Sequence, residues 1–365
     1  MAAESSATSA SAVPKGTAAA LQLVKCKVSA SLLPGNLVLG SRSYAYIHRN
    51  EVCLVPSSSV VLGSEKSDAI KVAYTDKDAV NGVDITKVAG LGEVVVIINQ
   101  AGAIFIYDAE TGQKLLHSYK HTKASGVASA AGGSASAPAL SLKDQHLRGI
   151  ASDHKETLYI GTQSGDILVF NLTKTKFSLV KTLAAQGDAH GEWGITALAY
   201  SVPHATLVSG DENGSLCFWS GSGDAVSSAK MVRIDGGGGA VTKVGAPVNC
   251  LALGSGPVLA AAFTSGHIRL YDLARRQITH EICAHTRAIN ALDIHPSKPI
   301  LLAASEDTFV SCWTIPSSSN PNIKQLMAES PALGLLTGCR FGGANGELIV
   351  TTVYDSRSLA LMHTP

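Results

Sequence analysis

The 365-residue sequence is short of charged residues, of aromatic residues and of net charge. Charged side chains make up 16% of the chain and aromatic side chains 5%, and 29 Lys and Arg face 28 Asp and Glu. Without an excess of either sign, no electrostatic field draws the chain onto nucleic acid or an anionic membrane. Neither is therefore expected as a partner. Hydrophobic residues, at 45%, are too abundant for a disordered protein and predict a large core.

Several targeting and catalytic signatures are also missing from the sequence. No apolar run reaches the length of a membrane span, and the N-terminus lacks the basic and apolar regions of a secretory signal. The Ser/Ala-rich residues 1–17 are expected to form a disordered tail. The seven cysteines include no C-x-x-C pair, which favours free thiols in a reducing compartment and a cytoplasmic location. Phosphate-binding glycine motifs and G-x-S-x-G do not occur, so we expect no catalytic residue, cofactor, metal or small-molecule substrate.

Seven segments of the chain share one pattern, in which an apolar strand, a turn and a second strand end on an aromatic or large aliphatic residue. They are YAYIHRNEVCLV, VVVIINQAGAIFIYD, TLYIGTQSGDILVFN, TLVSGDENGSLCFWS, VLAAAFTSGHIRLYD, LLAASEDTFVSCWT and LIVTTVYDSRSLALM. Their spacing is near or above the period of about 40–45 residues that is typical of propeller blades. Glycines 102, 165, 214 and 266 lie where a tight hairpin needs positive φ. Seven hairpins without helical periodicity predict an all-β, seven-bladed β-propeller.

An outer strand is expected after five of these hairpins, but the chain ends directly after the seventh. A spare strand, ALQLVKCKV over residues 20–28, precedes the first hairpin and would close the last blade. We therefore predict one propeller over residues 18–365, with low-complexity loops at 120–143 and 221–246.

The segment AHTRAINALDIHPSKPILLAASEDTFVSCWTI resembles a WD repeat. The resemblance implies that His285, Asp307 and Trp313, with Ser305 as the nearest strand hydroxyl, form a hydrogen-bonded chain inside the blade. A buried imidazole, carboxylate and indole N–H each need such a partner. The fourth repeat matches in part through His190, Ser209 and Trp219, with Asn213 in place of the aspartate.

A closer resemblance, over roughly residues 145–345, is to the WD repeat-containing protein 54 family. It is carried by RGIAS…GTQSGDILVF, SGHIRLYDL and EDTFV, where Thr308 follows the turn aspartate in place of the usual glycine. The resemblance implies a propeller without known chemistry and a link to cilia. We therefore expect a protein–protein interaction scaffold in a multiprotein assembly of the cytoskeleton, cilium or flagellum, with axonemal or microtubule proteins as partners.

Two other functions are alternatives to the scaffold. A substrate receptor of a cullin-type ubiquitin ligase is suggested by YDLAR, although Ala274 stands where the adaptor-docking motif has a basic residue. A propeller enzyme would need carboxylates or histidines at the starts of inner strands, where ITALAY, VNCLAL and INALDI offer mainly apolar and small residues. Partner identity decides between scaffold and receptor, and the fold does not supply it.

Trp193 and Arg287 are the candidate partner-binding residues. Each follows a histidine of the repeat motif and precedes an inner strand, where the chain crosses an open face of the propeller. Tryptophan and arginine are the residue types most enriched among interface anchors. In the alternative interpretation, Trp193 covers the core of its own blade and Arg287 is simply solvated.

Overall fold

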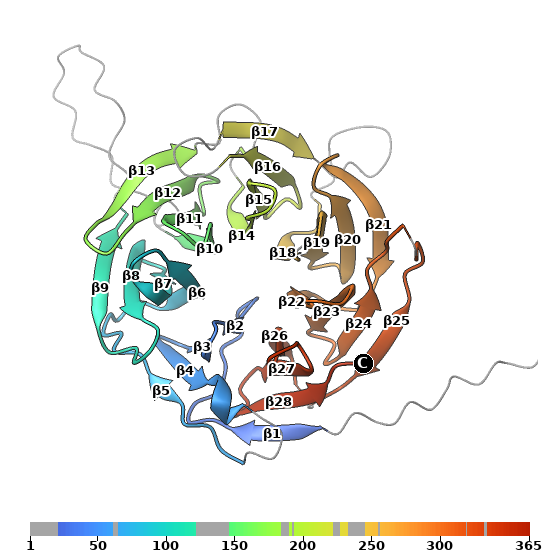
Figure 1. Ribbon diagram of the computed structural model, residues 1–365, viewed down its shortest axis with the longest axis horizontal. Helices are drawn as coiled ribbons and strands as arrows, with labels where there is room; N and C mark the ends of the chain where they lie inside the picture. Colours follow the sequence, from blue (N-terminus) through green and yellow to red (C-terminus); the bar gives the residue numbers. More distant parts are fainter. Residues whose placement is uncertain are drawn as a thin grey trace, which may run out of the picture.

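Figure 1 shows the computed structural model of the chain, a ring of seven antiparallel sheets arranged around a central axis. The structure describes residues 21–60, 65–121, 146–183, 190–191, 193–221, 227–232, 245–254, 256–318, 320–331 and 334–365. Each sheet has four strands, so the predicted all-β propeller of seven blades is confirmed.

The blades follow one another along the chain, each from its inner to its outer strand. Blade 1 consists of β2 (Val38–Leu39), β3 (Ser43–His48), β4 (Glu51–Pro56) and β5 (Ile70–Lys71), with the 3-10 turn η1 (Ser57–Ser59). Blade 2 has β6 (Val80–Val88), β7 (Gly92–Asn99), β8 (Ala103–Asp108) and β9 (Leu115–Lys120). Blade 3 has β10 (Leu147–Ser152), β11 (Thr157–Thr162), β12 (Ile167–Leu172) and β13 (Phe177–Leu183). Blade 4 has β14 (Ile195–Ser201), β15 (Thr206–Asp211), β16 (Leu216–Ser220) and β17 (Ser227–Val232). Blade 5 has β18 (Val248–Leu253), β19 (Val258–Phe263), β20 (His267–Asp272) and β21 (Gln277–Cys283). Blade 6 has β22 (Ile289–Ile294), β23 (Ile300–Ser305), β24 (Val310–Thr314) and β25 (Gln325–Glu329). Blade 7 has β26 (Leu336–Gly342), β27 (Leu348–Val353) and β28 (Ser358–His363), and its outer strand is β1 (Gln22–Lys25).

The two ends of the described chain meet in blade 7, as predicted. Strand β1 pairs antiparallel with β28, with Gln22 opposite Leu361 and Lys25 opposite Ser358 (Figure 1). Val24 is fully buried in a cluster that also contains Leu361 and reaches into blade 1. The N-terminal strand therefore covers what would otherwise be an open edge at the last blade.

The hydrophobic core is divided into seven clusters, each lying between two neighbouring blades. Between blades 2 and 3, for example, Val96 packs in one cluster with Leu158 and Phe170. Because the middle strands are covered on both faces, their apolar residues run continuously instead of alternating with polar ones. The blades are therefore held to one another by the same side chains that form their strands.

The hairpin turns adopt the backbone conformation that their glycines predict. Gly102, Gly165, Gly214 and Gly266 have φ between 78° and 84°. In blade 6 the same place in the turn is occupied by Thr308, whose φ is 75°. A β-branched residue in this left-handed region is strained, so the turn of blade 6 is less favourable than its counterparts.

One loop expectation is wrong, and others fall on residues that the structure does not describe. Strand β17 lies inside the predicted loop 221–246 and pairs with β16, so blade 4 has an outer strand that the sequence pattern did not reveal. Its sequence, SSAKMV, has no run of β-branched or aromatic residues, and pairing with the edge of β16 holds it in place. The expected tail at 1–17, residues 122–143 of the loop at 120–143, and residues 222–226 and 233–244 lie outside the described residues.

No helix in the described part of the chain is long and apolar enough to cross a membrane.

Candidate functional site

Blade 4 contains a buried chain of hydrogen bonds that links a histidine to a tryptophan. His190 Nδ1 lies 2.7 Å from Asp211 Oδ2, and His190 Nε2 lies 2.6 Å from Ser209 Oγ. The indole N–H of Trp219 donates to the same serine oxygen at 2.8 Å. Since Trp219 is only 2% exposed and Ser209 is fully buried, the chain satisfies polar groups that water cannot reach.

The expectation that blade 4 lacks the carboxylate is wrong. Asn213 does occupy the turn position that Asp307 has in blade 6, but the carboxylate comes from Asp211, the last residue of β15. Its second oxygen, Oδ1, accepts the backbone N–H groups of Asn213 and Ser215 and so also stabilises the turn. Asp211 lies two residues before Asn213, at the end of the strand. Its carboxylate still reaches His190, because the imidazole lies between the loop and the strand.

Blade 6 also has a hydrogen-bonded chain from a histidine to a tryptophan, but its aspartate and serine come from other positions of the blade. His285 Nδ1 lies 3.0 Å from Asp307 Oδ2, and His285 Nε2 lies 2.8 Å from Ser311 Oγ. The indole N–H of Trp313 donates to Ser311 Oγ at 2.8 Å. Ser305 is therefore not the bridging hydroxyl that the resemblance suggested. Its hydroxyl donates to the carbonyl oxygen of Ala288 at 2.9 Å.

The electrostatics of the blade 6 chain follow from its burial. Burial lowers the pKa of His285, against the opposing effect of Asp307. Burial also acts to raise the pKa of Asp307, but the backbone N–H of Thr286, the charge of His285 and the backbone N–H of Phe309 together lower it. The ionised Asp307 thus serves as an acceptor that orders the turn and the loop. In both blades the serine hydroxyl is buried behind the indole, where a substrate cannot approach it.

Trp193 and Arg287 are exposed in equivalent loops, each before an inner strand. The Trp193 side chain is 40% exposed, and Arg287 is 59% exposed while its guanidinium lies 3.5 Å from Glu306. A side chain on Gly165 would come within 2.9 Å of the Trp193 carbonyl oxygen, and one on Gly266 within 3.0 Å of that of Arg287. Each loop therefore lies against the hairpin turn of the preceding blade, which places both residues on the same face of the propeller.

A third exposed residue on this face was not singled out from the sequence. Phe309, in the hairpin turn of blade 6, is 44% exposed and follows the strained Thr308. The same turn is joined to the Arg287 loop, because the Glu306 N–H donates to the Ala288 carbonyl oxygen at 2.9 Å. The only sequence signal was an aromatic residue in a turn, where polar residues are the rule.

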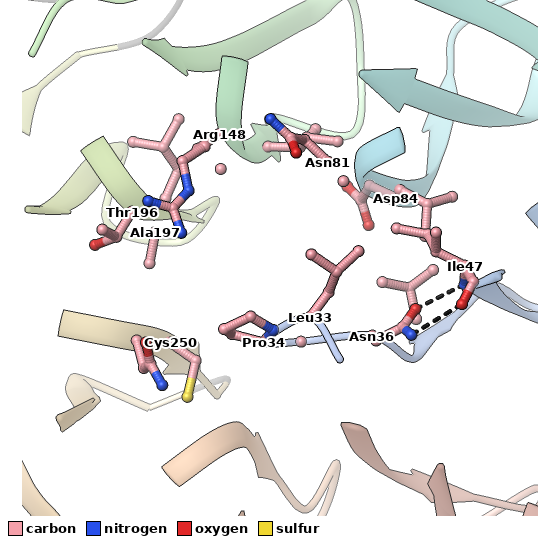
Figure 2. A pocket seen from close by; sticks show the side chains of 18 of the residues that line it. Leu33, Pro34, Asn36, Ile47, Asn81, Asp84, Arg148, Thr196, Ala197 and Cys250 are labelled. Carbon is pink, nitrogen blue, oxygen red and sulfur yellow. Dashed lines mark hydrogen bonds between the residues drawn. The ribbon is translucent and has the colours of Figure 1, made fainter. Parts of the chain in front are cut away.

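A cavity of about 300 Å³ lies in the central channel, as Figure 2 shows. Its walls are formed mainly by the inner strands of blades 2 to 5, together with Arg340 from β26 and the segment 33–36 ahead of β2. Its polar and charged side chains include Asn81, Asp84, His146, Arg148 and Asn249. The inner strands ITALAY, VNCLAL and INALDI of blades 4, 5 and 6 are mainly apolar, whereas β6 and β10 contribute the charged residues Asp84 and Arg148.

The cavity is joined to the face that carries Trp193 through a short polar network. Arg148 donates to Glu212 Oε1 at 3.0 Å, and Gln163 donates to the same oxygen at 2.8 Å. Gln163 also lies against Gly194, and the Glu212 N–H donates to the Gly194 carbonyl oxygen at 3.0 Å. The residue after Trp193 is thus held against the wall of the cavity.

The charged groups do not form a metal centre in the part of the chain that the structure describes, where no three His, Cys, Asp or Glu residues gather closely enough to hold an ion.

Comparison with known proteins identifies relatives over much of the chain. The family model described as WDR54 matches residues 37–362. WD repeat domain 54 of Rattus norvegicus is 30% identical over 234 residues, which cover 60% of this chain and 64% of that protein. WD repeat-containing protein 54 of Homo sapiens is 31% identical over 216 residues, covering 57% of this chain and 60% of that protein. The chain therefore spans less than two thirds of the length of these relatives.

Among solved structures, a chain of the crystal structure of the mitotic checkpoint complex superposes with a TM-score of 0.72. The match covers 98% of this chain and 99% of that one at 15% sequence identity. At this identity the likeness establishes the propeller fold and nothing about shared partners.

Proposed function

The chain belongs to the WDR54 family, and we propose that it is a non-enzymatic scaffold that binds other proteins through the face carrying Trp193, Arg287 and Phe309. WD-repeat propellers are generally non-catalytic interaction scaffolds, which supports the first part of the proposal. The choice of face rests on the Trp193 indole, which is 40% exposed and precedes Gly194, a residue that lies against Gln163 in the cavity wall.

The backbone around Trp193 favours a preformed binding surface. The Trp193 N–H donates to the His190 carbonyl oxygen at 3.1 Å, and His190 is itself fixed by Asp211 and Ser209. On the other side, Gly194 is held by Glu212. An anchor that is already ordered loses little conformational freedom when a partner binds, so more of its contact energy appears as affinity.

We place this scaffold in a multiprotein assembly of the cytoskeleton or of the cilium or flagellum, in the cytoplasm, with axonemal or microtubule proteins as partners. The resemblance that runs through residues 145–345 supports this setting. The alternative, a substrate receptor of a cullin-type ligase, is less well supported, because Ala274 offers no basic group and Arg275 comes one place beyond the position where the docking motif has its basic residue.

The proposal is tested by capturing partners with a double variant, Trp193→Ala with Arg287→Ala. The tagged protein is recovered from cells of the organism that makes it, and its partners are quantified by mass spectrometry. A matched control, Ile278→Ala with Leu326→Ala, removes two side chains of similar exposure, 42% and 43%, from the outer strands of blades 5 and 6. We expect the control to retain the main partners and the double variant, with an unchanged circular dichroism spectrum, to lose them. Equal recovery by both variants would refute the assignment of this face.

A further inference from the structure

The central channel is only partly open, because a segment from the N-terminal side enters it. Leu33 and Pro34 lie near the middle of the ring of lining residues in Figure 2. The backbone N–H of Gly35 donates to the Asn290 carbonyl oxygen at 2.6 Å, and that of Asn36 to the Thr337 carbonyl oxygen at 3.0 Å. The segment therefore fills the side of the channel near blades 6 and 7 and leaves the cavity on the side of blades 2 to 5.

Asp84 is a half-buried carboxylate at the wall of this cavity. It lies on the inner strand β6, and its carboxylate points towards the space between the blades (Figure 2). Among the described residues it is in no ion pair, and its hydrogen-bond donor is the adjacent Ile85 N–H, at 2.9 Å from Oδ1. Burial raises the pKa of Asp84 to about 7, against the opposing effect of the Arg340 guanidinium.

The two arginines of the cavity also interact with other acids. Arg148 pairs with Glu212 at 3.0 Å. Arg340 donates from Nη1 to the Leu292 carbonyl oxygen at 2.9 Å, and its charge acts to lower the pKa of both Asp84 and Asp293. The three carboxylates of Asp84, Asp293 and Glu212 therefore accompany two guanidinium groups, which leaves one negative charge in excess.

Two asparagines also line the cavity, Asn81 on the same strand as Asp84 and Asn249 on β18 of blade 5. The amide nitrogen of Asn81 donates to the Leu147 carbonyl oxygen at 3.2 Å, and that of Asn249 to the Ile289 carbonyl oxygen at 3.1 Å. These bonds engage the amide nitrogens, and both side-chain oxygens can still accept a hydrogen bond. A carboxylate that shares its cavity with amide acceptors complements a group that carries positive charge and several N–H donors.

We infer that the cavity receives the cationic end of a lysine or arginine side chain, with Asp84 as its counter-ion. The source of that side chain rests on the proposed function, since the cavity adjoins Trp193 through Gln163 and Gly194. A partner held by the indole can therefore place a basic residue in the channel. The volume, about 300 Å³, is at the lower end of ligand pockets and suits one side chain.

The inference is tested with small probes that carry one side chain each: N-acetyl-lysinamide, N-acetyl-argininamide and, as the uncharged analogue of the first, N-acetyl-norleucinamide. Binding to the full-length protein is measured by saturation-transfer NMR and by titration. We expect at least one cationic probe to bind at least tenfold more tightly than the norleucine probe. Failure of both cationic probes to bind, or equal binding of the norleucine probe, would overturn the inference.

Two variants then locate the binding site. Asp84→Asn keeps the shape of the side chain and removes its charge, and it should weaken binding of the cationic probe at least tenfold. The control Asp68→Asn alters an exposed carboxylate outside the cavity and should leave binding unchanged. If Asp84→Asn does not fold, Asn81→Leu removes a neighbouring acceptor and should weaken binding several-fold. Unchanged binding in the folded variant would contradict the role of this wall.

Whether the cation belongs to a partner protein is tested separately from the location of the partner-binding face. The double variant Trp193→Ala with Arg287→Ala should bind the probes normally, since neither side chain lines the cavity. Loss of partners by this variant supports the face whether or not the probes bind. Partner capture should also fall in folded Asp84→Asn. If that variant loses the probe but retains all partners, the assignment of the cation to a partner is wrong and the site takes a free small cation.

Discussion

Ser209 on β15 and Ser311 on β24 play the same part in two blades, each accepting an indole N–H at 2.8 Å and lying within 2.8 Å of a histidine Nε2. They do not occupy equivalent places, because Ser209 pairs across the strands with Cys217 and Ser311 pairs with Ala303. The requirement that is common to both blades is therefore the buried histidine and tryptophan. The hydroxyl between them can be supplied from either of two adjacent strands.

Because Ser311, and not Ser305, lies between His285 and Trp313, we expect only the Ser311 hydroxyl to affect the Trp313 indole. Ser311→Ala removes the acceptor of the Trp313 indole and should lower the free energy of unfolding by about 1–3 kcal/mol. It should also shift the indole N–H resonance of Trp313. Ser305→Ala breaks a different bond, to Ala288, and should leave that resonance in place. A shift caused by Ser305→Ala alone would contradict the assignment.

The strained turn of blade 6 predicts a stabilising substitution. Thr308 has φ of 75°, a conformation that glycine adopts without steric penalty, so Thr308→Gly should raise the free energy of unfolding by about 1 kcal/mol. The reverse test is Gly214→Ala at the same place in blade 4, where φ is 82° and the new methyl would lie 2.5 Å from the Ala246 carbonyl oxygen. That change should destabilise the protein. Urea unfolding of both variants checks the pair, and a destabilised Thr308→Gly would contradict the account.

The two tryptophans inside blades should differ in their contribution to stability. Trp219 is 2% exposed, and Trp219→Ala should lower the free energy of unfolding by about 3–5 kcal/mol, as other large core truncations do. Trp313 is only partly buried, so Trp313→Ala should be less damaging than Trp219→Ala. Chemical denaturation measures both, and a loss below about 1 kcal/mol for Trp219→Ala would show that its blade core does not depend on it.

Closure of the ring by β1 predicts that a small N-terminal change destabilises the whole molecule. Val24→Asp buries a charge in the cluster between blades 7 and 1 and should lower the melting temperature and promote aggregation. Leu23→Asp, next to it and 48% exposed, is the matched control and should have little effect. Equal melting temperatures for Val24→Asp and the unmodified protein would show that the strand is dispensable.

The environment of Asp84 predicts an unusual dependence of stability on pH. Its pKa is raised to about 7 in the folded protein, compared with about 3.9 in an unfolded chain. Between these values the folded state binds more protons, so this group's contribution to stability is lost as the pH rises from about 4 to about 7. Asp84→Asn should therefore be more stable than the unmodified protein at pH 8, and the two should converge near pH 4. A constant difference across this range, measured by urea unfolding, would be incompatible with the raised pKa.

Much of the fold was predictable because it depends on local signals. The glycine turns, the continuous apolar runs and the missing seventh outer strand together predicted seven blades and their closure by β1. Strand β17 escaped because its pairing comes from the edge of β16 and not from its own composition. The candidate site was less predictable because its contacts, like the pairing of β17, depend on tertiary packing and not on local composition. Asp211 and Ser311 reach their histidines through space, from positions that no repeat spacing marks.

The cavity was even less predictable from the sequence than the hydrogen-bonded chains of blades 4 and 6. Asp84, Arg148 and Arg340 lie far apart in the sequence and share a wall only because the ring closes. Nothing in the sequence around Leu33 indicates that residues 33–36 enter the channel, since the segment is held by backbone groups of blades 6 and 7 and by the bonds between the Asn36 side chain and Ile47 of blade 1. Trp193 is proposed as an anchor from its residue type and loop position, and its exposure is consistent with that proposal.

Hydrogen–deuterium exchange on the recovered complex can map whether partners bind the face of Trp193, Arg287 and Phe309. Amide exchange is compared between the free protein and the complex, with the outer strands β13 and β21 as the internal reference. We expect slower exchange on binding in peptides that cover residues 193–196, 286–288 and 305–310, with little change in the outer strands. Protection confined to the outer strands, with these three segments exchanging as in the free protein, would contradict binding at this face.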